Sequence, residues 1–348
     1  MVAFCSPSRL RKYALKCMLV AFGLIALPSF AQRQTDSPHA VAWKLKALLQ
    51  TPDSQIDYAQ AKLLIDQLID PTTDVAGVTK KLDAMAAGVR AMLPFARRTS
   101  TYEKVEAITT YLYKPGPWNK HQVFKYDLEN DPTGTKIFGN NLMAKYLQSR
   151  RGNCVSMPIL FLILGQKLGL DVTLSTAPNH VFLKVRDETG TYQNIEATTG
   201  GPKKDSSYER ELAISKRAIE SGVYLRTLTK TESVAVMAHT LLEYYCDKKE
   251  NNLNKVHAVA DLILQFNPKN ADAMVHKGST YAYVLNRRFK SKYSSYEAIP
   301  PELRDEATSL MKNIGFWYDK AQALGWQEET KEAKQAYMQM VKRAKEPQ

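Results

Sequence analysis

Metal-binding and phosphate-binding motifs are missing from this sequence of 348 residues. It contains only four cysteines and six histidines. These are scattered, and neither a Cys-x-x-Cys nor a His-Glu-x-x-His pattern occurs. A glycine-rich loop of the kind that cradles phosphates is absent as well. We therefore expect no metal site and no bound cofactor, which argues against metal-dependent and nucleotide-binding functions.

Long apolar runs are also missing, except for one near the N-terminus. Cys17–Leu27 is apolar, follows a basic stretch without acids and precedes Ser29-Phe30-Ala31. This pattern is typical of a signal peptide that is cleaved after Ala31. The run is too short to span a bilayer comfortably, and an uncleaved N-terminal anchor is the alternative. We expect residues 1–31 to be a signal peptide and the protein to be bacterial, periplasmic or secreted, with no integral membrane segment after cleavage.

Positive charge is in excess. The formal net charge is +13, and removal of the four basic and no acidic residues in 1–31 lowers it to +9. The remaining basic residues are spread along the chain, and a nucleic-acid role conflicts with export. We expect no nucleic-acid partner. A soluble basic surface is the simple explanation, and attraction to anionic envelope polymers or lipid headgroups is the alternative.

One cysteine stands where a buried helix is expected to begin. Cys154 follows the turn signal Gly152-Asn153 and precedes an apolar run that ends at Lys167-Leu168-Gly169, a helix stop. Unpaired N–H groups at a helix start lower a thiol pKa and can bind an oxyanion. Asn153 and the pair Asn140-Asn141 are further candidate oxyanion donors.

Three strand-like runs follow this helix, namely Asp171–Thr176, His180–Arg186 and Thr191–Thr198. The segment between the last two, Asp187–Gly190, is typical of a hairpin turn. A three-residue loop would pair Phe182 with Glu196 and place His180 on the same face as Glu196, as its diagonal neighbour. A loop of two or four residues would place these two side chains on opposite faces.

A thiol, an imidazole and a carboxylate in this order are the parts of a cysteine nucleophile system. Cys154 would attack an amide carbonyl, His180 would carry the proton, and Glu196 would orient the imidazole. Taken singly, they have simpler explanations as a core cysteine, a strand-end histidine and a surface acid. As an ordered set they predict a catalytic triad. A disulfide between Cys154 and Cys246 is the competing use of the thiol, but it would consume the nucleophile.

At these residues the chain resembles the transglutaminase-like superfamily, whose fold is related to papain. That family has Cys at a helix start, His opening a strand, and an acid before Ala-Thr or Pro-Thr. Here the acid is Glu196 instead of the more usual Asp. Residues from about 69 to 201 resemble a bacterial subfamily that joins this core to a tetratricopeptide tail, and many of its members lack the Cys. The supporting pieces are Asp70-Pro71, Leu82–Met85, Asn140–Leu142 and Leu147–Gly152.

Apolar residues at helical spacing predict helices on both sides of this block. The predicted helices are His39–Leu49, Ile56–Leu68, Val75–Leu93, Thr101–Tyr113, Asn140–Gln148, Glu209–Ser221, Ser233–Glu250, Val256–Phe266, Ala273–Leu285, Pro300–Leu324 and Thr330–Arg343. The phrase Asn267–Ala271 resembles a junction between tetratricopeptide repeats. From about Asn251 onward we expect only helices, with a turn at Asn267–Asn270.

The fold class that follows is α+β: a papain- or transglutaminase-like core of N-terminal helices and an antiparallel sheet, then an all-α tetratricopeptide-like region. We expect the signal peptide at 1–31, the core at 32–205 and the helical region at 206–348. The resemblance implies an exported amide hydrolase, peptidase or acyltransferase acting on a protein or peptide. The alternative is an inactive envelope scaffold whose helical tail binds a protein partner.

Overall fold

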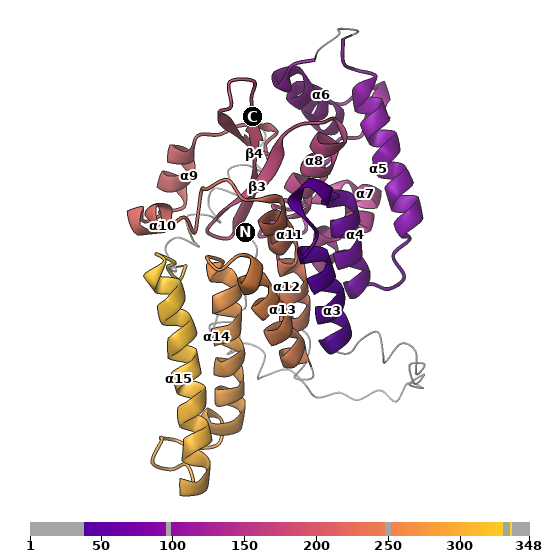
Figure 1. Ribbon diagram of the computed structural model, residues 1–348. Helices are drawn as coiled ribbons and strands as arrows, with labels where there is room; N and C mark the ends of the chain where they lie inside the picture. The colour runs from indigo at the N-terminus through magenta and orange to yellow at the C-terminus, as the bar shows by residue number, and fades with distance from the viewer. Residues whose placement is uncertain (1–37, 95–98, 248–251, 330–334, 336–348) are drawn as a thin grey trace. The chain divides into compact units, whose positions relative to one another are not determined.

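The computed structural model of the protein describes residues 38–94, 99–247, 252–329 and 335 (Figure 1). The predicted signal peptide and nearly all of the predicted helix at 330–343 lie outside these residues. The described chain divides into two units. The first comprises Gln50–Met237 with the residues from Gly325 onward, and the second comprises the residues up to Leu49 with Ala238–Leu324. The domain boundary expected after residue 205 stays a prediction.

A four-stranded antiparallel sheet organises the first unit, in the order β3-β4-β5-β6. The strands are β3 (Val172–Ala177), β4 (His180–Arg186), β5 (Tyr192–Glu196) and β6 (Gly201–Pro202). The first three agree with the predicted strands. The fourth was not predicted, since two residues carry no alternating pattern. It forms because its backbone pairs with the end of β5.

The register of β4 against β5 is the one that a three-residue loop predicts. Leu183 pairs with Ile195, and the N–H of Asp187 donates to the carbonyl oxygen of Thr191 at 2.8 Å. Gly190 has φ +88°, a conformation that glycine adopts without steric cost. Side chains alternate along a strand, so His180 and Glu196 lie on the same face of the sheet.

Helices precede and follow the sheet in the first unit. They are α4 (Tyr58–Ile69), α5 (Val75–Arg90), α6 (Thr101–Tyr113), α7 (Met143–Ser149), α8 (Ser156–Lys167), α9 (Asp205–Glu211), α10 (Lys216–Glu220) and α11 (Lys230–Met237). Local capping explains where the first of them begin. The side chains of Asp57, Asp74 and Ser100 each accept a backbone N–H of the first turn, which contributes about 1 kcal/mol per helix.

Helices α8 and α9 cover opposite faces of the sheet (Figure 1). Ser156–Gly165 is buried all round, as expected of a helix inside the core. A Cβ on Gly165 would lie 3.0 Å from a methyl group of Val172, so α8 packs on the face of β3 that carries Val172. Tyr208 of α9 stacks on Phe182 of β4, which belongs to the other face.

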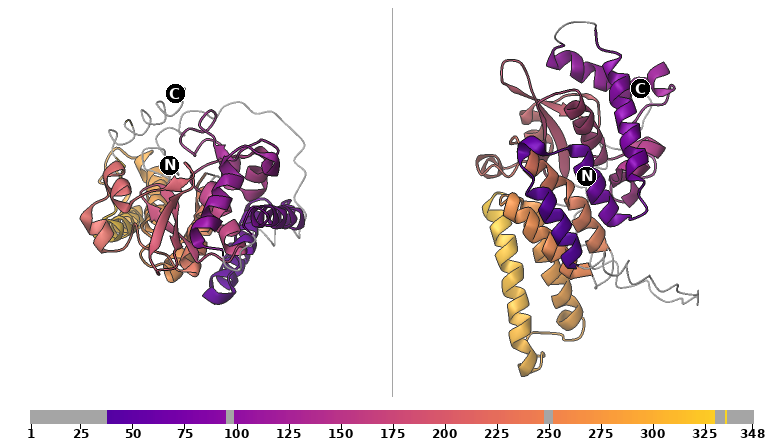
Figure 2. Two further views of the ribbon diagram at one scale, coloured as in Figure 1. Left: turned by 90° about the horizontal axis from the view of Figure 1, so that it is seen from above. Right: turned by 45° about the vertical axis from the view of Figure 1, so that its right-hand side comes forward.

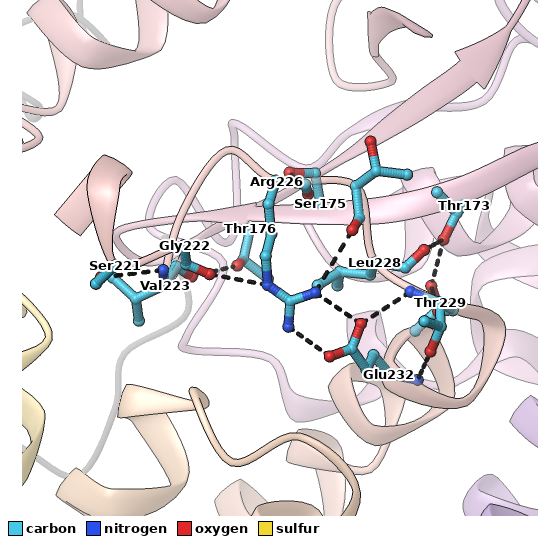
Figure 3. A network of polar contacts seen from close by, with 12 residues as sticks. Thr173, Ser175, Thr176, Ser221, Gly222, Val223, Arg226, Leu228, Thr229 and Glu232 are labelled. Carbon is cyan, nitrogen blue, oxygen red and sulfur yellow. Dashed lines mark hydrogen bonds and ion pairs between the residues drawn. The ribbon is translucent and has the colours of Figure 1, made fainter. Parts of the chain in front are cut away.

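The outer edge of β3 is covered by residues 223–228 (Figure 3). The N–H of Leu225 donates to the carbonyl oxygen of Thr176 at 2.9 Å. The hydroxyl of Ser175 donates to the carbonyl oxygen of Arg226 at 2.8 Å. The Arg226 guanidinium binds both carboxylate oxygens of Glu232 in α11, at 2.7 and 2.5 Å. This segment therefore joins α11 to the edge of the sheet.

Two predicted helices are interrupted. The helix predicted at Glu209–Ser221 is divided into α9 and α10, because Ala213 has φ +49° and the side chain of Ser215 caps a new helix by accepting the N–H of Ala218. The helix predicted at Ser233–Glu250 is divided into α11 and α12 (His239–Asp247), with Ala238 between them. Apolar spacing continues through both breaks, so the sequence pattern does not reveal them.

The regular elements in the described part of the second unit are all helical. They are α3 (Pro38–Leu49), α12, α13 (Leu253–Phe266), α14 (Ala271–Leu285), a π-helical turn at Asn286–Lys290 and α15 (Pro301–Ala323). Helix α13 contacts α3 and α14, and α14 contacts α15. Figure 2 shows α15 in yellow beside α14 in orange.

The turn between α13 and α14 lies where it was predicted. The side chain of Asn270 caps α14 by accepting the N–H of Ala273 at 2.9 Å. Among the described residues from 252 onward there is no strand. The α+β class with a helical C-terminal region is confirmed, whereas the tetratricopeptide assignment stays a prediction. None of the described helices has the length and apolar character needed to cross a bilayer.

Candidate active site

Cys154 lies just before α8, at the helix start that the sequence predicts, and after a short strand that was not predicted. The strand β2 (Arg151–Gly152) pairs in parallel with β1 (Lys125–Tyr126). The side-chain oxygen of Asn153 then accepts the N–H groups of Val155 and Ser156 at 3.0 and 3.1 Å. These two donors are occupied, so they do not serve as oxyanion donors in this arrangement.

The candidate oxyanion donors beside Cys154 belong to a scaffold. Asn153 donates its side-chain amide to Asn141 Oδ1 at 2.6 Å and to the carbonyl oxygen of Gly134 at 3.3 Å. Asn140 donates to Asp131 Oδ2 at 3.1 Å. Asp131 is fully buried and also accepts backbone N–H groups of its own loop. The amides of Asn140 and Asn153 therefore hold the segment that carries Cys154.

A tight turn brings the first residue of β4 to the thiol. Ala177 of β3 pairs with His180 of β4, and the turn between them consists of Pro178 and Asn179. Asn179 has φ +55°, which asparagine tolerates better than most residues. Its carbonyl oxygen lies 3.8 Å from Cys154 Sγ. The His180 imidazole interacts with the Cys154 thiol and influences its pKa.

Glu196 binds the other side of the imidazole. His180 Nε2 lies 2.6 Å from Glu196 Oε2, and the carboxylate is buried. Glu196 Oε1 accepts the N–H of Thr198 at 3.0 Å and its hydroxyl at 2.6 Å. Glu196 Oε2 also accepts the hydroxyl of Tyr208 at 2.8 Å. Both carboxylate oxygens are thus satisfied, which a buried charge requires.

Tyr208 is a site residue that the sequence reasoning missed. It comes from α9, and its ring stacks on Phe182 with 4.2 Å between centroids and 22° between planes. Its centroid is 5.8 Å from that of His180. No motif marks Tyr208 in the sequence, because its contact with Glu196 depends on how α9 folds back over the sheet.

The charges of the site favour one protonation state. Burial raises the pKa of Glu196, but the charge of His180 and hydrogen bonds from His180 and Thr198 lower it, to about 2. Burial lowers the pKa of His180, but the charge of Glu196 and the hydrogen bond with Cys154 raise it, to about 9. Near neutral pH the site therefore holds an imidazolium beside a carboxylate.

Opposing effects act on the pKa of the Cys154 thiol. Burial raises its pKa, whereas its hydrogen bond with His180 and the positive charge of the imidazolium lower it. An imidazolium beside a thiol is the usual means of forming a thiolate in proteins. The three side chains can thus supply a nucleophile, a proton carrier and an orienting carboxylate.

Cys154 and Cys246 do not form a disulfide with each other. Cys246 belongs to the second unit, where its sulfur lies 3.3 Å from His276 Nδ1. Among the described residues, no group of three or more His, Cys, Asp or Glu side chains is placed to hold a metal ion.

Comparison with known proteins gives a family match. A family model described as the transglutaminase-like superfamily matches residues 76–241, a range that includes Cys154, His180, Glu196 and Tyr208. No curated protein and no solved structure matches the chain. The fold is α+β with a helical C-terminal region, and it is consistent with a transglutaminase-like core followed by a helical tail.

Proposed function

We propose that the protein is an exported transglutaminase-like cysteine enzyme that acts on amide bonds of a protein or peptide. It would be an amide hydrolase, a peptidase or an acyltransferase. One observation carries the proposal: His180 Nε2 lies 2.6 Å from Glu196 Oε2, and the same imidazole interacts with the Cys154 thiol and influences its pKa. This is the nucleophile, base and orienting group of a triad.

The first half of the reaction would form a thioester. The Cys154 thiolate attacks the carbonyl carbon of the substrate amide, and the new C–S bond gives a tetrahedral intermediate. The C–N bond then breaks as His180 donates its proton to the leaving amine. The acyl group stays on the sulfur, and His180 is left neutral and able to accept a proton.

The second half would release the acyl group. Water or an amine attacks the thioester carbonyl, and His180 takes the proton of the incoming nucleophile. The C–S bond breaks and restores the thiolate beside the imidazolium. With water the product is a carboxylic acid, and with an amine it is a new amide that joins two molecules.

Glu196 would act through His180 throughout. Its carboxylate binds Nε2, so the other ring nitrogen, Nδ1, is the one that carries the proton to and from Cys154. The carboxylate also stabilises the imidazolium. A role of this kind is that of an orienting charge, and Glu196 itself stays ionised.

Location in the periplasm or outside the cell rests on the N-terminal sequence. The basic stretch, the apolar run Cys17–Leu27 and the small residues up to Ala31 support cleavage of a signal peptide after Ala31. Intact mass measurement of the protein purified from the periplasm or medium tests this. A mature protein that begins at Met1 would contradict it.

Selective alkylation tests the enzyme proposal without a known substrate. We expect iodoacetamide to label Cys154 near neutral pH faster than it labels Cys246, and peptide mapping distinguishes the two thiols. Cys246→Ser is the matched control, and it should leave the labelling of Cys154 unchanged. Peptide amide libraries with and without an added amine would then separate hydrolysis from transfer. An inert Cys154 in the folded protein would contradict the proposal.

A non-catalytic binding module is the second candidate. Helices of the second unit expose large apolar side chains, with Trp43 of α3 at 71% and Phe316 of α15 at 56%. Such side chains are enriched where proteins bind partners. The labelling experiment distinguishes the candidates, since this function requires no reactive thiol at Cys154.

A further inference from the structure

The Glu196 carboxylate is shared between His180 and a second donor from another element. Tyr208 OH lies 2.8 Å from Oε2, the same oxygen that is 2.6 Å from His180 Nε2. Burial and the charge of Glu196 raise the pKa of Tyr208 well above its usual value. The phenol therefore stays protonated near neutral pH, where its hydroxyl donates to Glu196.

The Tyr208 ring is fixed on both sides. One side stacks on Phe182, and the ammonium group of Lys203 lies 4.6 Å from the ring centroid. Lys203 is held in turn by a 2.6 Å ion pair with Glu211. A ring packed in this way has few rotamers, so the direction in which its hydroxyl points is set before any substrate binds.

The helix that carries Tyr208 is itself tied to the sheet. Asp205, the first residue of α9, binds the side chain of Lys184 in β4 at 3.2 Å and that of Asn194 in β5 at 2.7 Å. Lys184 is buried, and it pairs across the strands with Asn194. This anchor lies on the same face of the sheet as His180 and Glu196, and it sets the position of α9 over them.

A glutamate needs more support than a shorter acid would. Its side chain has three rotatable bonds, and the last of these has a broad torsional preference. Hydrogen bonds from Thr198 fix the position of Oε1. The position of Oε2 depends on its own two partners, His180 and Tyr208. Loss of the Tyr208 hydroxyl would leave His180 as the single donor that orients this oxygen.

We propose that Tyr208 is a positioning residue, whose hydroxyl fixes Glu196 Oε2 against His180 Nε2 and so maintains the imidazolium beside Cys154. The inference rests on the proposed function, which it extends to a fourth side chain from α9. Tyr208 does not touch the thiol or the reacting atoms. Its effect reaches the nucleophile through Glu196 and His180.

The test is the titration of His180 in Tyr208→Phe. The variant keeps the ring and its stack on Phe182 and removes only the hydroxyl. NMR of the full-length protein with labelled histidine gives the pKa of His180, whose signal is assigned by its absence from His180→Ala. We expect the titration in Tyr208→Phe to move to lower pH by about half a pH unit or more, since Glu196 is less well directed at the imidazolium.

Tyr58→Phe is the matched control. Tyr58 is fully buried, and its hydroxyl donates to the carbonyl oxygen of Val172 at 3.3 Å, so this variant also loses one buried tyrosine hydrogen bond. It should lose thermal stability without moving the His180 titration. A second control combines Tyr208→Phe with Glu196→Gln, where removal of the hydroxyl should cause no further shift because its acceptor charge is already gone.

The outcomes separate the two proposals. A His180 titration that is identical in the wild type and in Tyr208→Phe overturns the positioning role, whatever the reactivity of Cys154. A shift in Tyr208→Phe together with an inert Cys154 overturns the enzyme proposal and leaves the positioning of Glu196 intact. A shift of equal size in Tyr58→Phe would mean a general loss of structure, and it too would overturn the assignment.

Discussion

Asn153 donates its side-chain amide to the side-chain oxygen of Asn141 at 2.6 Å, and its own side-chain oxygen accepts the N–H of Ser156 at the start of α8 at 3.1 Å. One buried side chain thus joins the loop before α7 to the start of α8. Asn153, the residue before Cys154, therefore supports the position of the thiol, and its side-chain amide is bound to other residues of the protein.

Asn153→Ala should destabilise the fold. It removes the acceptor of the Val155 and Ser156 N–H groups and leaves Asn141 without this donor in a buried position, which together cost about 2–3 kcal/mol. Urea unfolding measures the loss. Asn313→Ala is a suitable control, because the Asn313 side chain donates to the carbonyl oxygen of Ser309 within its own exposed helix turn, and it should change stability by less than about 0.5 kcal/mol. Equal losses in the two variants would contradict the scaffold role.

His180→Ala should slow the alkylation of Cys154 near neutral pH. Without the imidazolium, burial of the thiol is no longer opposed by this charge, and less thiolate forms. We expect a decrease of about tenfold or more in the rate with iodoacetamide, measured by peptide mass spectrometry. His39→Ala, an exposed residue of α3, should leave the rate unchanged. A rate that is as high in His180→Ala as in the wild type would exclude the thiolate–imidazolium pair.

The contribution of the His180–Glu196 pair to stability should depend on pH. The pKa of Glu196 is lowered to about 2, so its contribution is present above the unfolded value near ~4.3 and lost as pH falls toward 2. The pKa of His180 is raised to about 9, so its contribution is present below ~6.5 and lost as pH rises through 9. The contribution of the pair to the free energy of unfolding should therefore be largest between pH ~4.5 and ~6.5.

Glu196→Gln measures this contribution. The difference in unfolding free energy between wild type and variant should be on the order of 2 kcal/mol near pH 5.5 and smaller at pH ~3 and ~9.5. Glu220→Gln, at an exposed position, should show no such maximum. A difference that stays constant from pH ~3 to ~9.5 would show that the two side chains are not coupled.

Substitution by alanine should change the stability of the protein differently at the two neighbouring glycines after β5, Gly200 and Gly201. A Cβ on Gly200 would lie 2.7 Å from the ring of Tyr113, and its φ is +75°. Gly201 has no heavy atom within 4 Å of such a Cβ. Gly200→Ala should cost about 1–3 kcal/mol by thermal or urea unfolding, and Gly201→Ala less than about 0.5 kcal/mol. The reverse order would contradict the backbone conformation at this turn.

The β4–β5 hairpin could be predicted from sequence because its determinants are local. Asp187–Gly190 contains the turn residues, and the flanking strands alternate, so the loop length fixes which side chains share a face. That register placed His180 beside Glu196. The catalytic roles of Cys154, His180 and Glu196 stay predictions, since geometry alone does not show turnover.

Features that depend on distant segments could not be predicted. Tyr208 reaches Glu196 because Asp205 ties α9 to the sheet, and no local pattern encodes that tie. The scaffold around Asn153 likewise joins residues from three separate segments. The break at Ala213 was also hidden, because apolar spacing continues through it.

Residues 223–228, which cover the outer edge of β3, also keep that edge from pairing with another copy of the protein. A bare strand edge offers N–H and carbonyl groups to any other extended chain, and this is a common route to aggregation. Residues 223–228 occupy that edge of β3, and at the opposite edge of the sheet Pro202 has no N–H to offer. A shortened core that ended before Val223 would open the edge of β3, so the smallest soluble piece of this fold should extend at least through α11.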